Sequence, residues 1–78
     1  MATAMSLVLM TRRGCHLCEE ALDLLHELGV NPELADVDSD DQLHDQYDWR
    51  VPVVLLDGRV IAEGRITRHQ LQKALGLA

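Results

Sequence analysis

Aromatic residues are almost absent from this chain of 78 residues, which has one Trp, one Tyr and no Phe. A hydrophobic core must therefore be aliphatic, and it can form because 47% of the residues are hydrophobic. The chain has only two cysteines, too few for the several disulfide bridges that stabilise small secreted scaffolds. The length suffices for a single compact domain, which we expect to span residues 1–78.

Positive charge is also scarce, because 7 Lys and Arg stand against 13 Asp and Glu, for a net charge of −6. Nucleic-acid phosphates need a basic face, and anionic membranes need a polybasic patch. We therefore expect neither nucleic acid nor a membrane as partner. Six aspartates lie between Asp36 and Asp48, where a solvated surface explains them most simply.

Long hydrophobic runs are missing as well. The apolar run from Ala4 to Met10 is short, no positive residue precedes it, and Arg12 and Arg13 follow it. This pattern predicts a buried strand rather than a signal-peptide core or a membrane span. We accordingly expect a cytoplasmic protein. In that reducing compartment, two close cysteines favour redox or metal chemistry over a structural bridge.

Hydrophobic periodicity in the first half of the chain predicts alternating strands and helices. Ser6–Thr11 is typical of a strand, and Cys15–Leu28 carries apolar residues at the three- and four-residue spacing of a helix. Glu33–Val37 is a plausible second strand. Ser39 and Gln42 have the spacing of a capping box, so a short helix should follow to about Tyr47.

The second half predicts a hairpin and a last helix. Val53–Leu56 and Arg59–Ala62 flank Asp57-Gly58, a turn in which both residues need positive φ. Thr67 and Gln70 form a capping-box pattern, with Leu71, Ala74 and Leu75 expected to face the core. The order β-α-β-α-β-β-α predicts an α/β fold with one mixed four-stranded sheet covered by helices.

The two cysteines occupy the boundary between the first strand and the first helix. Cys15 and Cys18 are three residues apart at the predicted helix start. Unpaired N–H groups and the helix dipole stabilise a thiolate at such an end, and the thiolate is the reactive form of cysteine. Cys15 is thus expected to be the exposed nucleophile, and Cys18, one turn deeper, can resolve a mixed disulfide on it.

Two alternative roles for the cysteines stay open. Both could be buried packing residues, although that does not explain Cys15 next to Gly14 at the helix start. They could also form half of a zinc site, but the histidines supply no second ligand pair at a suitable spacing, these being His16, His26, His44 and His69. We therefore expect no metal within one chain. A metal or iron–sulfur cluster shared across a dimer remains as an alternative.

A Val-Pro step precedes the third predicted strand. Pro52 suits the first residue of a strand, whether its peptide bond is trans or cis. Together, the segment Thr11–Cys18, Val51-Pro52-Val53 and the following hairpin and helix resemble the glutaredoxin-like branch of the thioredoxin-fold family, in particular its short bacterial members.

The resemblance implies a sheet in strand order 2-1-3-4, a cis Pro52 that faces the cysteines, and Val51 backbone groups that pair with an extended thiol substrate. It matches Cys15 to the nucleophile and Cys18 to the resolving thiol. The function it implies is thiol–disulfide oxidoreduction on protein or small-molecule disulfides. The substrate-binding residues that we expect are Arg12, Arg13, His16, Leu17, Arg50, Val51, Pro52 and Gly64.

The chain departs from glutathione-binding members of that family at several positions. His16-Leu17 replaces Pro-Tyr between the cysteines, Arg50 replaces Thr before Val-Pro, and a single Gly64 follows the last strand. These departures leave open whether glutathione is the reductant. No cofactor is expected. Gly64 could allow a close backbone approach, and an arginine could meet a substrate carboxylate.

The only aromatic residues precede the Val-Pro step. Tyr47 and Trp49 could line a substrate groove beside the cysteines, or could pack the second helix onto the sheet. We expect a monomeric enzyme that a thiol reductant such as glutathione, or a reductase, returns to the dithiol state. The alternative function is a thioredoxin-fold adaptor whose cysteines are incidental.

Overall fold

The computed structural model describes residues 6–77. Residues 1–5 and 78, which the sequence prediction includes in the domain, lie outside the described residues. The elements follow the predicted order, with a short 3₁₀ helix (η1) in addition: β1 (Leu7–Thr11), α1 (His16–Glu27), β2 (Glu33–Asp36), η1 (Val37–Ser39), α2 (Asp41–Tyr47), β3 (Val53–Leu56), β4 (Arg59–Glu63) and α3 (Arg68–Ala74). Among residues 6–77, no helix is both long and apolar enough to cross a bilayer.

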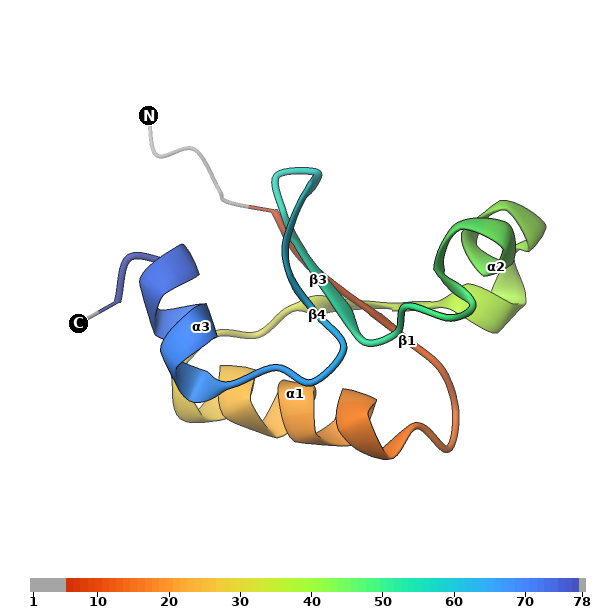
Figure 1. Ribbon diagram of the computed structural model, residues 1–78. Coiled ribbons are helices and arrows are strands. Elements are labelled where there is room, and N and C mark those ends of the chain that lie inside the picture. The colour runs from red at the N-terminus through yellow and green to blue at the C-terminus, as the bar shows by residue number, and fades with distance from the viewer. Residues whose placement is uncertain (1–5, 78) are drawn as a thin grey trace.

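The sheet has the predicted four strands, in the order β2-β1-β3-β4. β1 pairs with β2 in parallel, as a crossover through α1 requires, and with β3 antiparallel. The hairpin of β3 and β4 is antiparallel. Figure 1 shows α1 and α3 together on one side of the sheet, with α2 apart from them near one end of the strands. This is the fold that the sequence predicts.

The core lies between the sheet and the pair α1 and α3. Leu9 pairs with Val54, and Val54 with Ala62, so these three side chains share one face of the sheet. They pack with Ala21 and Leu25 of α1 and with Leu71 of α3. All of these residues are aliphatic, as the shortage of aromatic residues requires.

Two predictions in the helices are wrong in detail. Ala74 is exposed, because the inner face of α3 runs through Leu71 and Leu75 and Ala74 lies on its flank in the last turn. Ser39 does not cap α2; its hydroxyl donates to the Asp36 carbonyl at 2.7 Å within η1. Asp40 caps α2 instead, and its carboxylate accepts from the backbone amide of Gln42 at 2.8 Å.

The hairpin turn and the start of α3 are as predicted. Asp57 and Gly58 have φ values of 51° and 83°. The Asp57 carboxylate also accepts the backbone N–H of Ser6 at 2.9 Å, which ties the turn to the start of β1. Thr67 and Gln70 form the complete capping box.

Candidate functional site

The cysteine motif lies where β1 gives way to α1. Gly14 has a φ of 77°, a conformation that costs glycine little and that turns the chain from the strand into the helix. The backbone N–H of Cys15 donates to the Arg12 carbonyl at 3.3 Å, which closes this turn. Cys15 is the N-cap of α1, in extended backbone conformation. Its sulfur is therefore held at the helix N-terminus.

Cys15 and Cys18 are joined as a disulfide, with their Cα atoms 5.2 Å apart. The backbone N–H of Cys18 points to the Cys15 sulfur, with 3.2 Å between nitrogen and Sγ. Cys18 is 2% exposed, whereas Cys15 is only partly buried. This is the difference in exposure that the sequence predicts for a nucleophile and a resolving thiol. An N–H donor aimed at Sγ also favours a thiolate there.

The Val51-Pro52 peptide bond is cis, as the resemblance implies. Pro52 is buried, and its carbonyl accepts the backbone N–H of Gly64 at 2.9 Å. Gly64 has a φ of 72° at this point. The segment before β3 is thereby joined to the segment after β4.

Arg12 is held by carboxylates of its own chain. Its guanidinium makes hydrogen bonds to both Asp38 oxygens at 2.6 and 3.1 Å, and to the Asp48 carbonyl at 3.0 Å. The Asp48 carboxylate lies 2.8 Å from the same group. The hydrogen bond from Arg12 holds the pKa of Asp38 below its usual value, and the two aspartates raise the pKa of Arg12. His44 lies within 3.9 Å of Asp38 and 3.4 Å of Asp48.

Arg50, which directly precedes the Val-Pro step, also forms an ion pair within the chain. Its Nε lies 2.9 Å from a carboxylate oxygen of Glu63, and its guanidinium lies 5.2 Å from the centre of the Tyr47 ring. This hydrogen bond raises the pKa of Arg50 and lowers the pKa of Glu63. Arg12 and Arg50 are thus both paired with carboxylates of the chain itself. Either side chain would have to break its ion pair before it could bind the carboxylate of a substrate.

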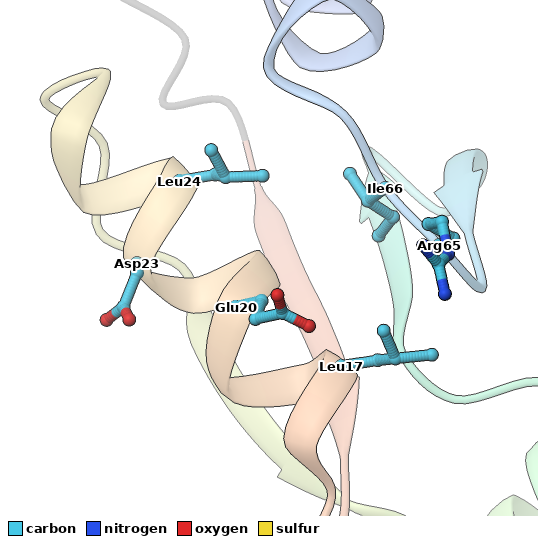
Figure 2. Close-up of a pocket in the computed structure, with 6 residues that line it drawn as sticks. All are labelled: Leu17, Glu20, Asp23, Leu24, Arg65 and Ile66. Carbon is cyan, nitrogen blue, oxygen red and sulfur yellow. The ribbon is translucent and has the colours of Figure 1, made fainter.

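The residues between and before the cysteines face solvent. Arg13 is exposed, and the His16 side chain is 91% exposed, with Nδ1 3.9 Å from a Glu19 oxygen. Leu17, 37% exposed, lines a surface pocket of about 360 Å³ together with Ile66 and Arg65. Figure 2 shows Leu17, Leu24 and Glu20 of α1 pointing across this pocket towards residues 65–66, whereas Asp23 points away. The cysteine motif therefore borders a hollow with an apolar wall.

Sequence reasoning missed the partners of the two arginines and the position of Trp49. Asp38, Asp48 and Glu63 lie 26, 36 and 13 residues from the arginines they bind, so no local pattern points to them. Trp49 is 94% exposed, which decides against one of its two alternatives, the packing of α2 onto the sheet. Within residues 6–77, no three His, Cys, Asp or Glu side chains are grouped so that they could hold a metal ion.

A mixed four-stranded sheet in this order, with a disulfide pair at the start of α1 and a cis-proline before β3, defines a thioredoxin-like protein. Residues 6–76 match the family model described as "Glutaredoxin-like domain (DUF836)", and the chain belongs to that family.

Relatives and solved structures agree with this assignment. The chain is 36% identical over 73 residues to the uncharacterized protein Rv0508 of Mycobacterium tuberculosis, covering 82% of this chain and 75% of that protein. It superimposes on protein XcR50 from X. campestris with a TM-score of 0.80, at 29% identity over 94% of this chain and 99% of the other. A mutant form of the thioredoxin-like protein BC3987 shares the fold, with a TM-score of 0.74 at 24% identity over 94% and 97% of the two chains.

Proposed function

We propose that this protein is a dithiol oxidoreductase that reduces disulfides of proteins or small molecules. The observation that carries the proposal is the Cys15–Cys18 disulfide at the N-terminus of α1, with Cys15 partly exposed and Cys18 buried behind it. A pair in this arrangement can alternate between dithiol and disulfide without any other group of the protein changing its covalent state.

The reaction has two exchange steps. In the first, the Cys15 thiolate attacks one substrate sulfur, an S–S bond forms between them, and the other substrate sulfur leaves as a thiolate that takes a proton from solvent. In the second, the Cys18 thiol loses its proton and attacks the Cys15 sulfur, which releases the remaining substrate thiolate. The substrate gains two electrons and two protons. The Cys15–Cys18 disulfide retains the oxidised state until a thiol reductant reverses the sequence.

The surroundings of the pair support this chemistry. The N-cap position and the N–H of Cys18 favour a thiolate on Cys15. The backbone beside the cis peptide would offer Val51 to an extended substrate, as the resemblance to glutaredoxin-like proteins implies. The site as we propose it further includes Arg13, His16, Leu17 and Gly64, with Arg12 and Arg50 holding it in shape. Action as a monomer in the cytoplasm, with glutathione or a reductase as electron donor, belongs to the same proposal.

Trapping the mixed disulfide tests the proposal. The reduced Cys18→Ser variant, mixed with oxidised glutathione or a disulfide-linked peptide, should accumulate an adduct on Cys15 that mass spectrometry detects. The reduced wild type should instead pass to the intramolecular disulfide, and Cys15→Ser should form neither product. Reduced Cys15 should also react with iodoacetamide at pH 6 at least tenfold faster than a model thiol, of which about 0.3% is thiolate at that pH. An ordinary alkylation rate together with no adduct from any disulfide would overturn the proposal.

A further inference from the structure

Trp49 is the most exposed large apolar side chain of the described residues, at 94% of its full accessible area. Tryptophan is highly buried on average in folded proteins, because its ring system has much apolar surface to remove from water. Leaving it in solvent forgoes that stabilisation. The exposure is notable in a domain that has only one other aromatic residue for its core.

The backbone on both sides of Trp49 is fixed. Asp48 is held through its carbonyl and its carboxylate by Arg12. Arg50 is held by Glu63 and lies over the Tyr47 ring. The amides of Arg50 and Val51 both donate to the Tyr47 carbonyl, at 2.9 and 3.2 Å. Trp49 is therefore presented outward by a constrained segment and is not carried on a free end of chain.

The same contacts connect the segment that carries Trp49 to the proposed reaction centre. Arg12, which binds Asp48, also accepts the backbone N–H of Cys15 through its carbonyl. Val51, two residues beyond Trp49, begins the cis peptide. Two residues of extended chain span at most about 7 Å, so one partner could contact Trp49 and Val51 together.

The charges near Trp49 indicate what kind of partner fits. α2 and its N-cap carry Asp40, Asp41 and Asp45 as exposed carboxylates, and the helix contains no Lys or Arg. The two arginines nearby are already paired with acidic groups. A complementary surface has an apolar recess for the indole ring and basic side chains around it.

We propose that Trp49 is a docking anchor for protein substrates: a polypeptide disulfide places an apolar side chain against Trp49 and basic residues over α2 while its cysteine reaches Cys15. The inference rests on the proposed function and adds the substrate class. Rigid aromatic side chains with few rotatable bonds dominate many interfaces in this way. A tripeptide such as glutathione lacks the apolar side chain, and its two carboxylates outweigh its single α-ammonium group.

The single Trp makes its own spectroscopic probe. The experiment uses Trp-free decapeptides with Leu and Phe beside one cysteine and either Lys or Glu at the ends. Adducts of the Cys18→Ser variant with each peptide and with glutathione are compared by Trp49 fluorescence. The Lys peptide should shift the emission to shorter wavelength, the Glu peptide less, and glutathione should leave it unchanged. Equal spectra for all three adducts would overturn the inference.

Steady-state rates provide the second arm. Trp49→Ala should raise KM for the Lys-peptide disulfide about tenfold, and Trp49→Phe should recover most of that loss. Both variants should reduce bis(2-hydroxyethyl) disulfide, a small neutral substrate, within twofold of wild type. Val60→Ala is the matched control, because Val60 is 42% exposed but lies next to the hairpin turn. An unchanged KM in Trp49→Ala contradicts the inference while leaving the proposed function intact.

A noncovalent titration distinguishes a failure of the proposed function from a failure of the inference about Trp49. The same Lys peptide with Ser in place of Cys should still quench or shift Trp49, and added salt should weaken the binding because the peptide and α2 carry opposite charge. If no disulfide yields an adduct, the proposed function fails, and this titration still decides whether Trp49 binds a basic apolar peptide.

Discussion

Arg12 binds Asp48 twice, through the backbone carbonyl at 3.0 Å and the carboxylate at 2.8 Å. The same side chain binds both oxygens of Asp38. Since the Arg12 carbonyl also accepts the amide of Cys15, one residue connects the cysteine turn to η1 and to the end of α2. Long-range contacts of this kind fix the position of the Val51-Pro52 segment relative to the cysteines.

Replacing Arg12 should therefore disturb the site as well as the fold. Arg12→Gln should lower the urea midpoint of unfolding and slow the reduction of a small neutral disulfide several-fold, because the 48–51 segment is no longer held. Arg12→Lys keeps the charge but not the planar fork that binds both aspartates, so it should fall in between. Arg59→Gln, at an exposed position at the start of β4, is the control and should match wild type in both measurements. Equal behaviour of the Arg12 and Arg59 variants would contradict this role.

Acid should weaken the same contact in a defined direction. The pKa of Asp38 is lowered in the folded chain by its hydrogen bond from Arg12, whereas an unfolded aspartate titrates at about 3.9. Its stabilising contribution is thus complete above that value and is lost as the pH falls through the lower, folded-state pKa. The urea midpoints of wild type and Asp38→Asn should differ at pH 6 and converge towards pH 3. The control is Asp45→Asn, at an exposed position of α2, and its urea midpoint should match that of wild type at both pH values. A difference between wild type and Asp38→Asn that widens in acid would contradict the assignment.

The fold could be predicted because its determinants are local in sequence. Asp57-Gly58, the capping box at Thr67 and Gln70, and the apolar stripe of α1 each depend on residues a few positions apart. Ser39 failed as a cap because Asp40, next to it, offers a carboxylate that accepts two backbone amides. Sequence spacing alone does not decide between two adjacent capping residues.

The site was predictable only in part. Cys15 and Cys18 are close in sequence, and their placement at a strand–helix boundary follows from the pattern. The partners of Arg12 and Arg50 come from distant segments, so only the assembled sheet brings them together. The sequence left two positions open for Trp49, and its exposure decides against packing onto the sheet. Hydrophobicity favours burial, but α2 contributes no buried residue and so offers no interior beside Trp49.

The hairpin turn offers a test that is confined to backbone conformation. Gly58 has a φ of 83°, and a Cβ added there would meet no atom within 4 Å. Gly58→Ala should thus lose about 1–2 kcal/mol of unfolding free energy through the left-handed conformation alone. Gly58→Asn should lose less, since Asn tolerates that region better. Urea denaturation measures both, and the alkylation rate of Cys15 should stay at the wild-type value. A neutral Gly58→Ala would contradict the strain argument.

The helix α3 has only seven residues and one fully buried side chain, Leu71. Leu71→Ala should cost about 2–5 kcal/mol, because the cavity would lie between the sheet and α1, where neighbours cannot collapse fully. A chain of 78 residues has a total stability of about 4–12 kcal/mol, so this one change should shift the urea midpoint markedly. Ala74→Ser, in the exposed flank of the same helix, should change stability by less than about 0.5 kcal/mol. Equal losses of stability in the two variants would contradict the assignment of Leu71 to the inner face of α3 and of Ala74 to its exposed flank.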